Sequence, residues 1–205
     1  MKKILVLACL LAGSAVFAAT DDFENHLLTA SNQKLNMNSR WSSLLAAAEL
    51  ADHDQLDEIK KFSSDKEWYM RNAALVALNK VNRDAAIIEA RKLLSDKSLV
   101  VRSAAVEVVA QRMNLENKKA LIEEIDKAYN FHKKSSLWIR LQILEKVAEV
   151  AGSSEREIFV KTLFDSDPKI ATLSAATLEK ITGKKLEGKK FVESWKSYVA
   201  DKKWM

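Results

Sequence analysis

Apolar positions along the chain recur with the period of an α-helix. After Asp96, the apolar residues Val101, Ala105, Val108 and Val109 fall at spacings i, i+4, i+7 and i+8, which places them on one helix face. No stretch of useful length alternates with a period of two, and the sequence holds only 4 Gly and 1 Pro, so strands are not expected. The pattern therefore predicts an all-α fold.

Three similar segments indicate an internal repeat. Each has an Asp followed eight residues later by an Ala-Ala pair, and these residues are Asp65, Asp96 and Asp167. In the first two segments an apolar residue and an Arg stand at the same offset, and Arg71 and Arg102 are 31 residues apart. The same step backwards reaches Arg40, and a step of 38 forwards reaches Arg140. Periods of this length are typical of stacked units, of which we count about five.

Each unit is predicted to be a pair of helices. The first helix of a pair is expected at residues 56–62, 85–94, 115–131 and 158–164. The second begins near the Asp, which is a good N-cap; Ser135 or Ser136 would replace it in the fourth unit, and Pro168 suits a first helical turn. The small Ala pair would let helices approach closely, so Ala74 and Ala105 are expected to be buried.

The repeated motif resembles the HEAT-repeat family over residues 34–183. The matching residues are the three Asp, the Ala pairs, and the apolar-Arg pairs Met70-Arg71, Val101-Arg102 and Ile139-Arg140. The resemblance implies an α-solenoid of about five HEAT-like helix pairs, with second helices lining a concave surface. It also implies an Asp–Arg ladder between adjacent units, formed by Asp65, Arg71, Asp96, Arg102, Arg140 and Asp167. The first and fourth units carry Lys34 and Lys134 in place of the Asp.

The end of the chain is similar to the ending of bacterial HEAT-like proteins, where a Thr-Gly loop precedes a Trp-bearing helix. Gly183 can take the left-handed conformation that ends a helix. Phe191, Trp195 and either Tyr198 or Val199 would share one face of the last helix. We therefore expect a C-terminal helix that caps the open end of the stack.

The first residues have the features of a secretion signal. A basic start precedes a short apolar run at residues 4–11, and small residues lead to an expected cleavage after Ala18. A lipoprotein anchored through Cys9 is disfavoured, because the apolar run before it would be only about five residues. The predicted organisation is a signal peptide at 1–18, a HEAT-like repeat domain at 19–183 and a Lys-rich capping helix at 184–205.

This organisation predicts a periplasmic or secreted protein with no transmembrane segment in the mature chain. Cys9 is the only cysteine and lies in the signal, so the mature chain has no disulfide, thiol nucleophile or cysteine metal site.

Positive charge is concentrated at the C-terminus. Residues 180–205 hold eight Lys against three acidic residues, while the whole chain has a formal net charge of +5. These lysines are either a solvated face of the capping helix or a surface for an anionic partner, through Lys184, Lys185, Lys189 and Lys190. Nucleic acid is not expected, because the tail has no Arg and no binding motif, and the chain is predicted to be exported.

Nothing in the sequence predicts catalysis, a metal or a cofactor. His26, His53 and His132 lie in different units without a metal-ligand spacing, and the few glycines exclude a phosphate-binding loop. A GxSxG nucleophile elbow is absent as well. The sequence therefore favours a non-enzymatic protein.

A stripe of residues on the second helices is the predicted partner site. Positions two before, one after and five after the repeat Arg share one helix face. They are Tyr69, Asn72, Val76, Val100, Ser103, Glu107, Trp138, Leu141 and Glu145. Tyr69 and Trp138 would be the anchors for a protein or peptide, unless these rings pack between helices.

The fourth unit is seven residues longer than the 31-residue step, within residues 116–135. The extra length predicts either a binding insertion or a longer helix.

These features favour an exported, non-enzymatic protein-binding scaffold or adaptor. The alternatives are an envelope-surface binder of anionic partners through the Lys-rich tail, and an accessory subunit of an enzyme complex.

Overall fold

A computed structural model describes residues 22–186 and 190–204. The described chain is helical apart from its loops and one short two-stranded hairpin, which confirms the prediction of an all-α fold. The predicted signal peptide at residues 1–18 lies outside the described residues. The chain divides into two compact units, Met1–Val108 and Val109–Met205, which we call the N-terminal and C-terminal units.

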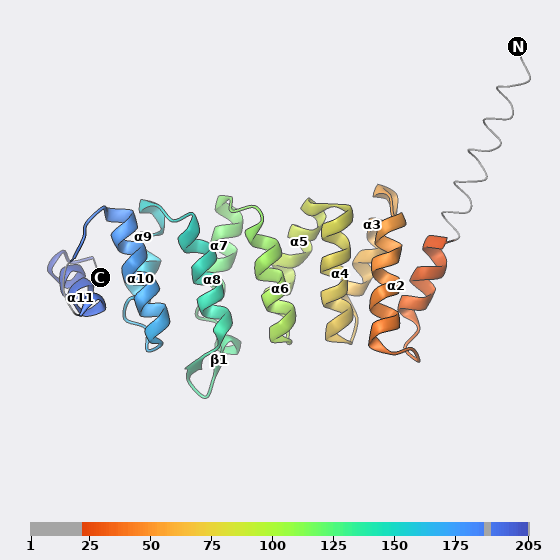
Figure 1. Cartoon of the computed structure of the whole chain (residues 1–205), viewed down its shortest axis with the longest axis horizontal. Helices are drawn as coiled ribbons and strands as arrows, with labels where there is room; N and C mark the ends of the chain where they lie inside the picture. The colour runs from red at the N-terminus through yellow and green to blue at the C-terminus, as the bar shows by residue number, and fades with distance from the viewer. Residues whose placement is uncertain (1–21, 187–189, 205) are drawn as a thin grey trace, which may run out of the picture. The chain divides into compact units, whose positions relative to one another are not determined.

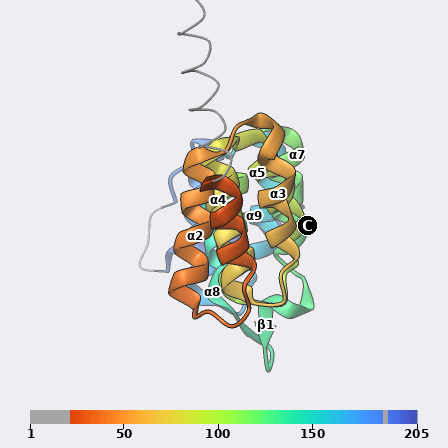
Figure 2. The same ribbon diagram turned by 90° about the vertical axis from the view of Figure 1, so that its right-hand side faces the viewer.

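The N-terminal unit is a two-layered arrangement of helices. Its elements are a helix covering residues 22–31, α2 (Met37–Leu50), η1 (His53–Gln55), α3 (Leu56–Lys61), η2 (Phe62–Ser64), α4 (Trp68–Val81), α5 (Arg83–Leu93) and most of α6 (Leu99–Ala110). The helices α2 and α4 lie side by side in one layer, and α3 and α5 lie in the other (Figures 1 and 2). Thus each first helix of a pair packs behind a second helix, and α4 contacts α2, α3 and α5.

Small residues let α4 sit at the centre of this unit. Its buried side chains are Met70, Arg71, Ala73, Ala74, Leu75, Ala77 and Leu78. The three alanines among them are fully inaccessible to solvent, as is Ala105 on α6, so the predicted burial of Ala74 and Ala105 is confirmed. Packing at the density of a protein interior leaves no room for a larger side chain there.

The C-terminal unit also consists of packed helices and ends in the helix α11. Its elements are α7 (Leu115–Glu124), η3 (Ala128–Asn130), β1 (Phe131–His132), β2 (Ser135–Ser136), α8 (Trp138–Glu149), η4 (Ser153–Glu155), α9 (Arg156–Thr162), α10 (Pro168–Thr182) and α11 (Phe191–Asp201). The second helix α8 packs on α7 and α10, and α10 packs on α9 and α11.

The turn residues Gly183 and Pro168 take the places predicted for them at the two ends of α10. Gly183 ends α10 with a left-handed φ of 69°, and Pro168 stands in the first turn of the same helix. Trp195 and Val199 of α11 are fully buried, and the Tyr198 ring meets the ring of Trp195 edge to face at 5.5 Å. The last helix therefore buries its aromatic face within the C-terminal unit.

The long helix predicted for residues 115–131 is wrong. The helix α7 ends at Glu124, and the chain then forms an antiparallel hairpin that pairs Phe131 with Ser136. Asn130 is fully buried, and its Nδ2 donates to the Glu124 carbonyl at 2.8 Å. A side-chain donor thus occupies a carbonyl at the helix end that a further helical turn would have used.

Arginine–aspartate pairs join successive repeats within each unit. They are Arg40–Asp65 at 2.7 Å, Arg71–Asp96 at 2.6 Å and Arg140–Asp165 at 2.6 Å. Each Asp follows its Arg by 25 residues, and the Arg71 pair is bidentate, with a second bond of 2.7 Å. The three arginine side chains are only 2–6% exposed, so the pairs are largely removed from water. Arg102 donates to the backbone carbonyl of Asp96 at 2.7 Å.

The prediction that Asp167 belongs to this ladder is wrong. Asp165 holds that place, and Asp167 is instead the N-cap of α10, where its Oδ1 accepts from Lys169 N at 2.9 Å. Conversely, Asp65 and Asp96 are not N-caps; each accepts from the backbone N–H two residues later, before the helix begins. The expected caps Ser135 and Ser136 are also wrong, because Leu137 is the N-cap residue of α8 and no side chain caps that helix.

The ladder makes the stability of the protein sensitive to acid. Burial alone would raise the pKa of the Asp96 carboxyl, but the hydrogen bonds from Arg71 and from Ser98 N outweigh it, so the pKa is lowered. Burial is likewise outweighed at Asp165, whose pKa is lowered by Arg140 and by Asp167 N. A lowered folded-state pKa adds stability above the unfolded value of about 3.9. That contribution is lost as the pH falls through the folded-state value.

We predict that Asp96→Asn lowers the free energy of unfolding at neutral pH by about 3–5 kcal/mol, because Arg71 is left buried without a counter-charge. Its stability should also fall less than that of the wild type as the pH drops below about 4, since one of the titrating carboxylates is gone. Denaturant titrations at neutral and acidic pH measure both effects.

The control is Glu58→Gln, which breaks an ion pair with Lys61. The side chains of Glu58 and Lys61 are 44% and 68% exposed. The substitution should cost roughly 0–1 kcal/mol. Equal losses in the two variants would contradict the prediction.

Ala74→Leu tests the packing of α4. The added side chain has no space at a fully buried position and should cost about 1–3 kcal/mol, measured by chemical denaturation. The matched control is Ala176→Leu on α10, at an exposed position in the middle of a second helix, which should leave stability nearly unchanged. An Ala74→Leu protein as stable as the wild type would show that α4 is loosely packed.

Candidate partner-binding site

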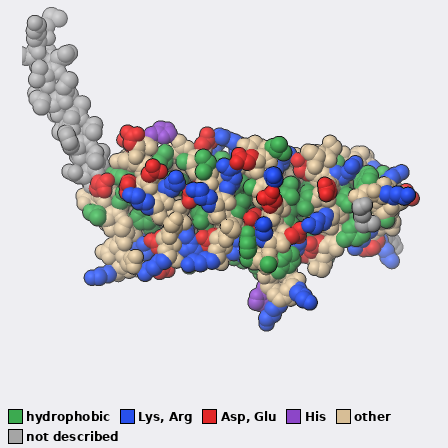
Figure 3. All heavy atoms as spheres, turned by 180° about the vertical axis from the view of Figure 1, so that it is seen from behind, with side chains coloured by type: hydrophobic (Ala, Val, Ile, Leu, Met, Phe, Trp, Pro, Cys, Tyr) green, Lys and Arg blue, Asp and Glu red, His purple; other side chains and the backbone are tan. Residues whose placement is uncertain are grey.

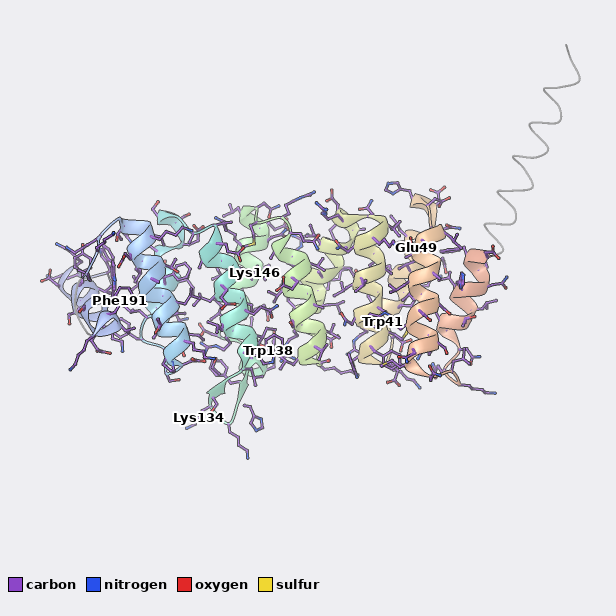
Figure 4. All side chains as sticks on the ribbon, viewed as in Figure 1. Trp41, Glu49, Lys134, Trp138, Lys146 and Phe191 are labelled. Carbon is purple, nitrogen blue, oxygen red and sulfur yellow. The ribbon has the colours of Figure 1, made fainter. Side chains whose placement is uncertain are left out.

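A groove lined mainly by aromatic and apolar side chains lies on the second-helix layer of the N-terminal unit. It has a volume of about 400 Å³, and its lining residues are Met37, Asn38, Trp41, Trp68, Tyr69, Asn72 and Val100. They come from the first two turns of α2, α4 and α6, and Figure 4 labels Trp41, which belongs to α2. We call this hollow the aromatic groove. Its lining contains no carboxylate, imidazole or amine.

The ladder positions one wall of the aromatic groove. Arg40 is 1% exposed; it donates through Nη1 to the Tyr69 hydroxyl at 3.1 Å and through Nη2 to Asp65. Burial would lower the pKa of the Arg40 guanidinium, but its hydrogen bonds to Asp65 and Tyr69 outweigh this and raise it. The Tyr69 ring in turn meets Trp68 edge to face, with centroids 6.1 Å apart and planes at 88°. A permanently charged, buried arginine therefore fixes the tyrosine against which the tryptophan rests.

One feature of the groove is unusual for a purely structural surface. Trp68 is 42% exposed, so much of a large apolar ring contacts water. The Oδ1 atom of Asn72, like those of Asn79 and Asn117, accepts no hydrogen bond within the described chain, but it is buried and therefore out of reach of a molecule in the groove.

The predicted stripe only partly coincides with the aromatic groove. Tyr69, Asn72 and Val100 line it. Val76 is 44% exposed but lies outside the lining, as do Ser103 and Glu107 on α6.

Sequence reasoning missed four lining residues, namely Met37, Asn38, Trp41 and Trp68. The signal was present for two of them: Asn38 and Trp41 stand two before and one after Arg40, the same offsets as in the other repeats.

A second groove lies between α8 and α10 of the C-terminal unit. It has a volume of about 580 Å³ and is lined by Leu141, Glu145, Pro168, Lys169, Thr172, Leu173 and Ala176. Leu141 and Glu145 belong to the predicted stripe. Once Asp165 is recognised as the ladder residue, Ala171 takes the place of the repeat Arg. Lys169, Thr172 and Ala176 then fall at offsets −2, +1 and +5. Offsets −2 and +1 therefore line a groove in each unit, whereas offset +5 lines only the groove of the C-terminal unit.

Trp138 lies outside both linings. It is 54% exposed at the start of α8, next to the hairpin (Figure 4).

The structure describes three of the four lysines predicted to meet an anionic partner. Lys184, Lys185 and Lys190 are exposed, and Lys184 Nζ lies 4.5 Å from the centre of the Tyr198 ring. Lys189 lies outside the described residues.

In the ranges 22–186 and 190–204, no group of three or more His, Cys, Asp or Glu side chains could hold a metal ion. Over the same ranges no helix is both long enough and apolar enough to span a bilayer.

Comparison with known proteins adds no relative: no protein-family model matches the chain, and no curated protein matches it.

Proposed function

We propose that this protein is an exported HEAT-like α-solenoid that acts as a non-enzymatic scaffold or adaptor and binds a protein partner. The observation that carries the proposal is the aromatic groove. It combines an exposed Trp68 with a Tyr69 whose hydroxyl accepts from the buried, ion-paired Arg40. These features are typical of a preorganised binding surface.

The size and chemistry of the groove favour a peptide segment as ligand. A volume of about 400 Å³ accommodates a few side chains, and it lies at the lower end of the range for ligand pockets. Tyr and Trp are enriched among the residues that dominate protein interfaces. Because Arg40 already holds Tyr69, less side-chain freedom is lost on binding.

The groove does not favour catalysis by the residues that line it. An acid or base would have to lie within hydrogen-bond reach of a substrate, and the lining offers none except the Tyr69 hydroxyl, which already accepts from Arg40. A role as the accessory subunit of an enzyme complex would use the same binding surface.

Trp68→Ala tests the proposed site. A random peptide library displayed on phage is selected against the purified mature protein, and an enriched peptide is then titrated against each variant. Trp68→Ala should weaken binding by at least about 30-fold, equivalent to roughly 2 kcal/mol, because the anchor ring is removed. Its melting temperature should stay close to that of the wild type, since the ring is 42% exposed.

The matched control is Ile88→Ala, which truncates a side chain that is 50% exposed on α5, in the other layer of the same unit. It should bind the peptide like the wild type. Failure to enrich any peptide, or enriched peptides that bind Trp68→Ala normally, would refute the aromatic groove as the partner site.

A further inference from the structure

The hairpin β1–β2 in the C-terminal unit has an unusual turn. Its two central residues, Lys133 and Lys134, both have left-handed backbone conformations, with φ of 47° and 71°. Two-residue hairpin turns with positive φ at both positions strongly prefer Asn-Gly, because other side chains are strained there. Outside glycine, the described residues have a positive φ only here and at Lys203. The sequence thus places two charged side chains where uncharged, more permissive residues would be more stable.

The hairpin is firmly attached at its foot. Leu137 N donates to the Asn130 carbonyl at 3.0 Å, which closes the loop, and Asn130 is fully buried. The Phe131 ring lies under the guanidinium of Arg140 at 4.2 Å, and Arg140 is held in turn by Asp165. The turn is therefore carried on a fixed base that belongs to the ladder.

The tip of the hairpin carries positive charge into solvent. Residues 132–135 are all exposed, and no ion pair involves Lys133 or Lys134 within the described chain. Figure 3 shows basic and histidine side chains gathered at this projecting end, and Figure 4 shows Lys134 pointing away from the helices.

Acidic side chains at the hairpin's foot are already engaged. Asp126 pairs with Lys161 and Arg140, and Asp165 pairs with Arg140, so neither neutralises the tip.

We propose that this basic hairpin (residues 131–136) is a docking arm for an acidic segment of a protein partner. Carboxylates of that segment would pair with Lys133 and Lys134, and an apolar side chain would rest on the exposed ring of Trp138 at the hairpin's foot. The proposal rests on the protein-binding function proposed above, but it uses different residues in the other unit.

The geometry favours an acidic peptide over an anionic membrane. The tip has no apolar side chain that could enter a bilayer, and two lysines alone attract a lipid surface only weakly. A diffuse anionic surface would also be served by unstrained lysines such as those of the C-terminal tail. A rigid turn instead holds the two charges at defined positions, which suits carboxylates carried at a matching spacing on a peptide.

The decisive variant replaces the turn by Lys133→Asn with Lys134→Gly. It keeps the hairpin, because Asn-Gly is the preferred sequence for this turn, and it removes both charges. The probe is a synthetic peptide of alternating Asp, Glu and Leu, followed by fluorescence anisotropy. We expect this variant to bind at least about 10-fold more weakly than the wild type and to melt at the same or a higher temperature. Loss of binding together with retained stability separates docking from folding.

Three controls complete the test. Lys185→Asn with Lys190→Asn removes two exposed charges from the same unit and should bind the probe like the wild type. A peptide in which Asn and Gln replace the acids should bind the wild type weakly. The fraction of protein that cosediments with phosphatidylglycerol vesicles should be equal for the wild type and the turn variant.

Three results would overturn the proposal: no binding of the acidic peptide to the wild type, unchanged binding to the turn variant, or vesicle binding that depends on Lys133 and Lys134. Each is independent of the Trp68→Ala titration, so the hairpin proposal can fail while the aromatic groove stands. If the Trp68→Ala titration fails as well, the protein-binding function itself is refuted.

Discussion

The buried Arg–Asp pair is the interaction on which the rest of each unit depends. A guanidinium that is 2–6% exposed would be strongly destabilising alone, so the helix that carries it is stable only when the Asp from the next repeat is in place. The separation of 25 residues is the same in each pair. It sets the length of chain between the Arg on one second helix and the Asp in the loop before the next second helix. Such pairs contribute less to net stability than to a unique register, because the alternatives leave a charge unpaired.

The same pairs connect the scaffold to both candidate sites. Arg40 bonds Tyr69 in the wall of the aromatic groove, and Arg140 lies over Phe131 at the foot of the hairpin. In each case a side chain near the surface is oriented by a residue whose own position is determined by a buried carboxylate. Surface residues held in this way lose little freedom when a ligand arrives, so interior electrostatics provide preorganisation at the surface.

The constant ladder spacing also explains where the longer repeat could accept extra residues. Arg140 and Asp165 keep the separation of 25, although Arg140 follows Arg102 by 38 residues instead of 31. The added length therefore lies before Arg140, and the structure places the hairpin between α7 and α8. A hairpin can form there without disturbing the pairing that follows.

The sequence predicts those features of the fold that depend on residues close together in the chain. Helical periodicity, the burial of Ala74 and the left-handed Gly183 follow from short-range patterns, and these predictions were correct. The prediction of Asp167 as a ladder residue was wrong because Asp165 also lies near the same helix start, and only the distant Arg140 distinguishes the two. The hairpin was missed because no Asn-Gly or similar dipeptide marks its turn.

The candidate sites show the same limit. The offsets of Asn38 and Trp41 were visible in the sequence, but the exposure of Trp68 is determined only after the helices have packed.

The two candidate sites differ in the physical property that they offer a partner. The lining of the aromatic groove is uncharged, so its contribution would come from burying apolar area, which supplies affinity with little long-range guidance. The hairpin carries unpaired lysines in solvent, where charge accelerates encounter and selects against basic partners but adds little affinity after solvent screening. A chain with both surfaces can select a partner by charge at the hairpin and hold it by apolar contacts in the aromatic groove. The strain at Lys133 and Lys134 is then explained by selectivity, because an Asn-Gly turn of the same shape would improve folding and remove the charges that choose the partner.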